Sequence, residues 1–218
     1  MSHKNLKLVL LNSLNDELCK YGFVLRKTNN EFFQKCEVGE NRFEIRFNTK
    51  YLLTATCATS IRCSVIQDLS CDILQAPAYI RRYHTFHSMM EDHPDFRMNN
   101  SFKLEAEENI PEIQQVFLKY FREVSLSIYK KYNTLEKIYE LYTNYTSEQE
   151  ELIRQSPDWY CDTIILARVL GKKDYPDLVL RYREIVKHYH QGLYLPTYEK
   201  VVIALENHPT PLISTRAN

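Results

Sequence analysis

The stretch from Ile110 to Asn144 constrains the fold of this chain most, because its apolar residues recur with the spacing of an α-helix. In its first part they lie three or four residues apart, at Ile110, Ile113, Phe117, Tyr120, Phe121, Val124 and Ile128. This spacing puts them on one stripe of a helix and leaves polar side chains on the rest of its surface. The pattern predicts a helix that begins near Ile110, breaks around Tyr132 and Asn133, and is followed by a second helix.

The residues at the helix ends support these boundaries. Asn109 is expected to accept a hydrogen bond from the first free backbone amides, and Pro111 suits the first turn, where an amide proton is not needed. Asn133 or Thr134 is expected to cap the second helix. The stretch therefore separates a mostly strand-like first part of the chain from a helical last part.

Before this stretch, the sequence predicts one helix and an antiparallel sheet. The helix runs from roughly Lys4 to Lys20, and Gly22 follows where a left-handed C-terminal cap is expected. Alternating apolar residues and β-branched residues predict the strands, at 23–27, 31–37, 43–47, 52–66 (one bent strand, or two that divide near 58–60) and 101–106. Asn29 and Asn30 supply the turn between the first two strands.

Between residues 67 and 100 the periodic pattern fails. Prolines and paired asparagines predict a long loop, with one short helix around Tyr79 to Met90. A loop of this length inside a compact domain is either functional or evidence that elements have been missed.

After Asn144 the sequence predicts helices throughout, at 147–155, 156–171, 175–190 and after Pro196, followed by a flexible tail at 208–218. Prolines 157, 176 and 196 are nearly evenly spaced, which indicates either a helical repeat or the common placement of proline at helix starts. The predicted fold is α+β: an N-terminal helix on a small antiparallel sheet of four or five strands, then an all-helical C-terminal half. We expect residues 1–108 and 109–207 to pack together as one composite unit.

Composition and charge weaken the nucleic-acid and membrane-surface interpretations without excluding a local charged patch. The chain has 218 residues and carries 28 basic and 28 acidic side chains, so no overall field attracts it to nucleic acid or to an anionic membrane. It shows no secretory signal and no apolar run of the ~18 residues that a membrane span needs. Six scattered cysteines favour free thiols in a reducing cytoplasm.

Several short segments resemble bacterial α+β proteins that belong to families of unknown function. These segments are Tyr21–Val24, Phe32–Phe33, Phe43–Phe47, Phe117–Phe121, Tyr132–Glu136, Ile165–Gly171 and Asp174–Tyr175. The resemblance implies a small open sheet backed by helices and offers no catalytic residues. Some relatives in such families neighbour toxin and immunity genes, which implies a protein-binding role.

Two groups of side chains are candidates for chemistry. Six side chains are of the types that bind zinc: Cys57, Cys63, Cys71, His84, His87 and His93. The cysteines are not closely paired, however, and they could equally be small residues of the core. The second group suits acid–base catalysis and comprises His87, Glu91, Asp92 and His93, although exposed loops commonly contain such residues.

Cys161 is a further candidate nucleophile. It follows two aromatic residues on a predicted helix, where an inert buried thiol is common. The sequence therefore predicts no catalytic, cofactor or metal residues, and an enzyme using the His84–Asp95 segment is the alternative function.

Aromatic and cationic residues suggest binding functions. Tyr79, Arg81, Arg82 and Tyr83, and Tyr129 to Tyr132, interleave rings and cations as single-strand nucleic-acid binders do, but two short groups do not form a stripe. Nucleic acid is therefore not expected as a partner.

Sixteen tyrosines are the most unusual feature of the composition, and several lie within or just after the central stretch. Tyrosine is enriched at protein interfaces because it combines rigid apolar area with a polar tip. We take Tyr129, Tyr132, Tyr139 and Tyr142 as candidate contacts to a partner protein, with helix-to-helix core packing as the alternative. The expected function is a cytoplasmic, non-enzymatic protein-binding module of the immunity or regulatory kind.

Overall fold

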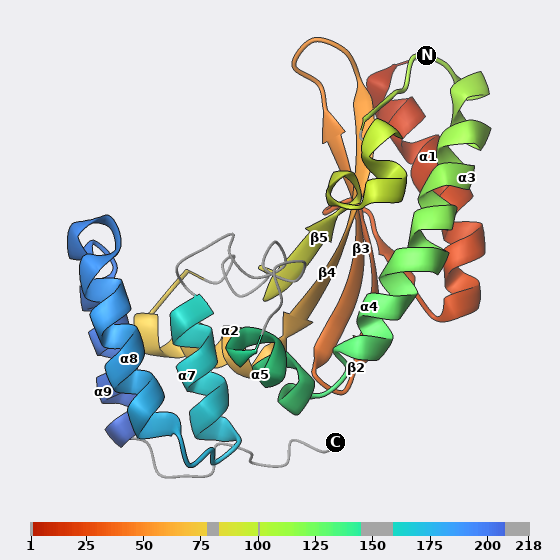
Figure 1. Ribbon diagram of the computed structural model, residues 1–218. Coiled ribbons are helices and arrows are strands. Elements are labelled where there is room, and N and C mark those ends of the chain that lie inside the picture. Colours follow the sequence, from red (N-terminus) through yellow and green to blue (C-terminus); the bar gives the residue numbers. More distant parts are fainter. Residues whose placement is uncertain (1, 78–82, 100, 145–158, 208–218) are drawn as a thin grey trace. The chain divides into compact units, whose positions relative to one another are not determined.

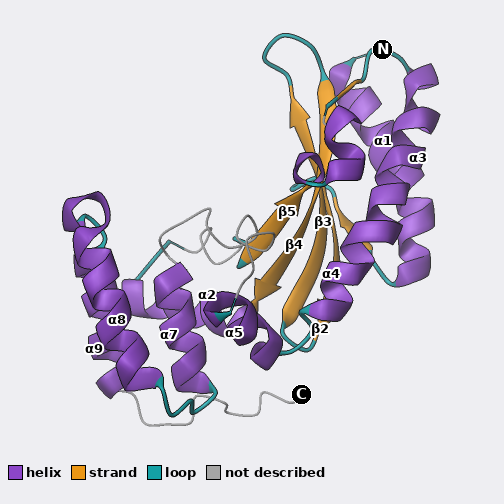
Figure 2. Cartoon of the chain, in the orientation of Figure 1, coloured by secondary structure: helices purple, strands orange, loops and turns teal. Residues whose placement is uncertain are grey.

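The computed structural model describes residues 2–77, 83–99, 101–144 and 159–207. The chain divides into two compact units, each built from two separate segments. The sheet unit comprises Met1–Arg62 and Phe86–Asn133, and the helical unit comprises Cys63–Thr85 and Thr134–Asn218. The class is α+β, as predicted (Figure 2).

The sheet unit contains a six-stranded antiparallel sheet in the order β1-β2-β3-β4-β5, with β6 paired to β4 (Figure 1). The strands are β1 (Val24–Arg26), β2 (Glu31–Cys36), β3 (Gly39–Asn48), β4 (Thr54–Cys63), β5 (Phe86–Met89) and β6 (Phe102–Lys103). Val24 pairs with Phe33, Ala58 with Met89 and Thr54 with Lys103.

Helices cover one face of this sheet (Figure 1). They are α1 (His3–Leu18), α3 (Ile110–Tyr120) and α4 (Leu126–Lys131), with a π-helical segment at Phe121–Ser125 between the last two. The Phe121 ring meets Phe23 and Phe43 edge-on, at centroid distances of 5.2 and 5.3 Å. The helices therefore bury the aromatic face of the sheet, which is the main source of stability for such a layer.

On the opposite face, β2 and β3 carry several charged side chains. Arg42 and Glu31 are buried, and each takes part in an ion pair: Arg42 with Glu40 at 2.6 Å, and Arg26 with Glu31 at 2.6 Å. Alternation along a strand sends these groups to the face opposite Phe32 and Phe43. The pairing supplies the partners that buried charges require.

The helical unit is organised around α7 (Trp159–Val169), whose residues from Cys161 to Ala167 are all buried. An α-helix that is buried on every side must be surrounded by other elements. Among the described helices, α2 (Ser64–Leu74), α5 (Leu135–Thr143), α8 (Tyr175–His188) and α9 (Leu195–Asn207) contact it.

Several sequence predictions are confirmed in detail. Gly22 has a φ of +79° at the end of the first helix, and the central stretch breaks at Tyr132 and Asn133. Thr134 caps α5, since its hydroxyl accepts a hydrogen bond from the Lys137 amide at 3.3 Å. The sheet has more strands than the four or five expected, because the sequence analysis missed β5.

The predicted long loop at 67–100 is wrong, because α2 and β5 occupy much of it. Helix α2 follows β4 directly and lacks the usual boundary signals. No side chain caps its start, where the Cys63 amide donates to Thr85 Oγ1 at 2.7 Å, and Gln75 rather than glycine takes the left-handed position at its end. The predicted helix around 79–90 is also wrong in its last residues, which form β5.

Two other local predictions need correction. Asn109 does not cap α3 with its side chain; its Oδ1 accepts hydrogen bonds from the amides of Glu105 and Ala106 at 3.2 and 3.0 Å. The strand predicted at 52–66 is one strand that ends at Cys63. The helix predicted at 147–155 and the tail at 208–218 lie outside the described residues.

Candidate functional site

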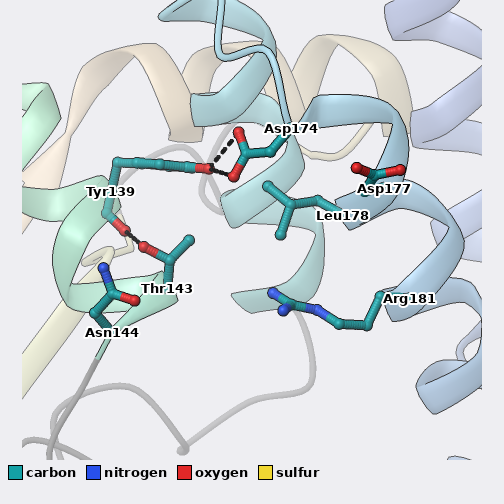
Figure 3. Close-up of a pocket in the computed structure, with 7 residues that line it drawn as sticks. All are labelled: Tyr139, Thr143, Asn144, Asp174, Asp177, Leu178 and Arg181. Carbon is teal, nitrogen blue, oxygen red and sulfur yellow. Dashed lines mark hydrogen bonds between the residues drawn. The ribbon is translucent and has the colours of Figure 1, made fainter.

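A pocket of about 270 Å³ lies within the helical unit, between the end of α5 and the start of α8 (Figure 3). Seven of the described residues line it: Tyr139, Thr143, Asn144, Asp174, Asp177, Leu178 and Arg181. The lining combines two carboxylates, one guanidinium, two neutral polar side chains, a phenol and one aliphatic wall. This mixture of charges distinguishes the pocket from an ordinary apolar core gap.

Helix α5 supplies one wall because Tyr139 and Thr143 lie one turn apart on the same face. Thr143 Oγ1 donates to the Tyr139 carbonyl at 2.9 Å, which fixes the threonine side chain along the helix. The helix ends at Asn144, whose amide donates to the Glu140 carbonyl at 2.8 Å. The exposed side chain of Asn144 lies at the rim.

Helix α8 supplies the other wall. Asp174 is its N-terminal cap residue, and Asp177, Leu178 and Arg181 follow at three-, four- and seven-residue offsets from it. These offsets place all four side chains on one helix face. Acidic residues in the first turn also interact favourably with the positive end of the helix dipole. The charge at this position is therefore compatible with helix stability.

One hydrogen-bond system joins the two walls. The Tyr139 hydroxyl donates to the Asp174 carboxylate, whose two oxygens lie 3.0 and 3.2 Å away. Burial raises the pKa of Tyr139, and the neighbouring Asp174 carboxylate raises it further. Lys172 Nζ lies 5.0 Å from the centroid of the Tyr139 ring. Tyr139 is therefore a proton donor that stays neutral over the ordinary pH range, rather than a general base.

Arg181 and Asp177 keep much of their hydrogen-bonding capacity. Arg181 Nη2 donates to the Tyr182 hydroxyl at 3.2 Å, which uses one of five guanidinium N–H groups. In the described part of the chain, Asp177 makes no hydrogen bond or ion pair. Figure 3 shows the Arg181 guanidinium and the Asp174 carboxylate on opposite sides of Leu178.

The four tyrosines singled out from the sequence are all buried, with 1 to 6% of their surface exposed. Tyr129 and Tyr142 donate to the backbone carbonyls of Arg42 and Thr85 at 2.6 and 3.2 Å. The Tyr132 ring packs edge-on against Phe86, at a centroid distance of 5.2 Å. Tyr139 is the one that reaches the pocket. Their role as partner contacts stays a prediction.

Two of the residues considered for zinc, Cys57 and His93, interact with neighbouring side chains. Cys57 Sγ lies 3.5 Å from Met90 Sδ, and His93 Nε2 lies 2.9 Å from Ser88 Oγ. Among residues 2–77, 83–99, 101–144 and 159–207, no group of three or more His, Cys, Asp or Glu side chains is arranged to hold a metal. All six cysteines are free thiols, and Cys161 is buried.

The catalytic alternative used the segment from His84 to Asp95, which the structure builds as β5 and a 3₁₀ turn. Asp92 accepts a hydrogen bond from the Met89 amide at 2.9 Å, so its carboxylate stabilises that turn. An enzyme at this segment stays a prediction.

The structure describes only some of the residues considered for nucleic acid. Tyr79, Arg81 and Arg82 are outside the described residues. Lys130 and Lys131 are exposed at the end of α4, where Lys131 Nζ lies 5.3 Å from the Tyr132 ring centroid.

Comparisons with protein-family models, with curated proteins and with solved structures gave no match for this chain. Within the described residues, no helix is long and apolar enough to cross a membrane.

Asp174, Asp177 and Arg181 were not among the candidates predicted from the sequence. Their spacing did contain a signal, because residues three and seven positions after Asp174 lie on the same helix face as Asp174. The second wall, from α5, could not be inferred, since no sequence rule brings residues 139 and 174 together.

Proposed function

We propose that this chain is a non-enzymatic protein-binding module whose contact surface lies on the outer face of α8 and α9. The observation that carries the proposal is the exposure of two large aliphatic side chains there, Leu180 at 60% and Ile203 at 56%. Exposed aliphatic side chains that share a surface favour association with another protein, because burial there removes apolar area from water.

The geometry of the helix pair brings these two residues together. Residues 189–194, which begin with the 3₁₀ segment Tyr189–Gly192, join α8 to α9. The two helices contact each other, so they run antiparallel. Arg183 on α8 pairs with Glu199 on α9 through two hydrogen bonds of 2.6 and 3.0 Å. This pair sets the register of the two helices.

Leu180 precedes Arg183 by three residues, and Ile203 follows Glu199 by four. Because the helices are antiparallel, both steps lead one turn in the same direction along the pair. We therefore place Leu180 and Ile203 on one patch, here called the Leu180/Ile203 patch, bordered by the Arg183–Glu199 ion pair. An apolar centre with a polar rim is the usual anatomy of a protein interface.

The proposed partner is a protein that presents an apolar side chain to this patch, in an immunity-like or regulatory role. The six free thiols support the cytoplasm as the place of action, since exposed and half-buried thiols persist under reducing conditions. Cys19 and Cys36 are the two cysteines that are not buried.

The test compares affinity capture by three forms of the full chain. The double variant Leu180→Asp/Ile203→Asp places charge on the patch, and Leu52→Asp is the matched control, an aliphatic residue of 48% exposure in the sheet unit. A partner should be recovered by the wild type and by Leu52→Asp, and lost with the double variant. Equal recovery of the same proteins by all three forms would refute the proposal. Thermal melts should confirm that each variant is folded.

A further inference from the structure

We propose that the pocket between α5 and α8 binds a small zwitterion that carries an ammonium and a carboxylate group, the chemical class of the free α-amino acids. This inference goes beyond the proposed function and does not depend on it, because the pocket and the Leu180/Ile203 patch use different residues. It rests on the size of the pocket, on the charges of its lining and on the hydrogen-bonding capacity that those charges retain.

Size restricts the ligand. Pockets for drug-sized molecules occupy roughly 300 to 1,000 Å³. The volume here, about 270 Å³, lies just below that range. A molecule of amino-acid size can enter it, whereas a nucleotide would extend well outside.

The carboxylate end of the ligand is assigned to Arg181. A guanidinium presents its donors in a planar fork that matches a carboxylate, and bidentate pairing gives short, strong hydrogen bonds. Arg181 uses one N–H group on Tyr182, which leaves its other donors for a ligand. The Asn144 side chain lines the same pocket and adds a further amide donor.

The ammonium end is assigned to Asp174 and Asp177. An ionised carboxylate has about four acceptor positions, and an ammonium has three donors. Tyr139 provides a single hydrogen to Asp174, so that carboxylate can accept more. Asp177 accepts none within the described residues. The Tyr139 hydroxyl orients Asp174, because it bridges both of its oxygens.

The separation of opposite charges on the two sides of Leu178 favours a zwitterion over a simple ion. Two carboxylates and one guanidinium leave one net negative charge in the lining. A simple carboxylate ligand would pair with Arg181 but would face two like charges, and a simple amine would leave Arg181 unpaired. A metal ion would need a third protein ligand, which the described part of the chain does not supply. Leu178 gives the middle of the ligand an apolar wall.

The test is a titration of the purified full chain followed by amide NMR shifts. Glycine and L-alanine are the zwitterions, and acetate and methylamine represent their two halves. Glycine or L-alanine should cause saturable shifts at Asn144, Asp177, Leu178 and Arg181, and each half should bind at least about tenfold more weakly. No saturable shift with either amino acid up to about 50 mM would overturn the proposal, as would equal binding of one half alone.

Two variants test the residues assigned to the carboxylate and to the ammonium group of the ligand one at a time. Arg181→Gln should weaken amino-acid binding roughly tenfold or more, and it should not weaken methylamine binding because it removes a positive charge that repels the amine. Asp177→Asn should weaken amino-acid binding, and it should not weaken acetate binding because it removes a negative charge that repels the carboxylate. Lys187→Gln and Glu184→Gln are matched controls, since both residues are exposed on α8 and lie outside the pocket. Unaltered amino-acid binding in both pocket variants would place the ligand elsewhere and refute the assignment.

Discussion

The hydroxyl of Tyr129 donates to the backbone carbonyl of Arg42 at 2.6 Å and so joins helix α4 to strand β3 within the sheet unit. Both residues are buried, and 87 positions of sequence separate them. If the tyrosine hydroxyl is removed, the buried carbonyl of Arg42 is left without a donor, because water does not reach it. The free-energy cost of this unpaired carbonyl exceeds the net stabilisation that an ordinary hydrogen bond provides. This contact therefore couples the helical layer to the sheet.

Tyr129→Phe should lower the free energy of unfolding by about 1 to 2 kcal/mol, since it removes the hydroxyl and keeps the ring. Urea denaturation monitored by circular dichroism measures the change. Tyr51→Phe is the control, because Tyr51 is 85% exposed and has no such bond to lose. An unchanged midpoint in Tyr129→Phe would show that this hydrogen bond does not stabilise the fold.

Stability should fall as the pH rises above about 10, the ordinary pKa of tyrosine. Burial raises the pKa of Tyr129 and of Tyr142 well above that value in the folded chain. At a pH below the tyrosine pKa of the unfolded chain, the hydroxyls are protonated in both the folded and the unfolded chain, so their full contribution to stability is present. Above it the unfolded state loses protons that the folded state keeps, which favours unfolding.

Each such tyrosine should contribute a slope of up to about 1.4 kcal/mol per pH unit in that range. Urea midpoints measured between pH 8 and pH 11 test this dependence. The Tyr129→Phe variant should show a shallower decline than the wild type. An identical decline in both would mean that Tyr129 ionises in the folded state as readily as in the unfolded chain.

Gly22→Ala should destabilise the sheet unit by more than about 1 kcal/mol. Gly22 has a φ of +79°, and an added Cβ would lie 3.1 Å from Gln34 Nε2, which donates to the Tyr21 carbonyl at 2.9 Å. Gly171→Ala is the matched control, because its φ is +61° and no atom lies within 4 Å of the added carbon. Thermal melts should show the larger loss for Gly22→Ala. An equal loss of thermal stability in the two variants would mean that the Gln34 side chain moves away from the added Cβ without destabilising the fold.

Gln75→Gly should stabilise the helical unit by about 0.5 to 1 kcal/mol. Gln75 ends α2 with a φ of +54°, a left-handed conformation that costs a residue with a Cβ roughly 1 to 2 kcal/mol. The greater freedom of glycine in the unfolded chain offsets part of this gain. Gln115→Gly, on the exposed side of α3, should instead destabilise by about 1 kcal/mol. Chemical denaturation should show a higher free energy of unfolding for Gln75→Gly and a lower one for Gln115→Gly than for the wild type.

The elements that the sequence predicted correctly are those with local signals. The spacing from Ile110 to Ile128, the cap at Thr134 and the glycine at position 22 each act within a few residues, so they can be read without a structure. Helix α2 has an uncapped start and Gln75 in place of glycine at its end, so these signals were missing. Strand β5 has only four residues, too few for a clear alternation.

The pocket was less predictable than the fold. The face of α8 that carries Asp174, Asp177 and Arg181 is implicit in their spacing, but the hydrogen bond from Tyr139 to Asp174 depends on tertiary packing. The buried state of Tyr129, Tyr132 and Tyr142 has the same origin. Composition indicated that tyrosines matter here and could not distinguish rings at a surface from rings in a core.

The path of the chain has a consequence for dissection of this protein. Helix α2 contacts α7 and α9, yet it lies in sequence between β4 and β5, two neighbouring strands of the sheet. A single cut after Asn133 would remove α5, α7, α8 and α9 and expose the buried side chains of Ile66 and Cys71. Isolation of either unit therefore requires rejoining the chain, for example by a short linker from Arg62 to Phe86, because no one peptide bond separates them.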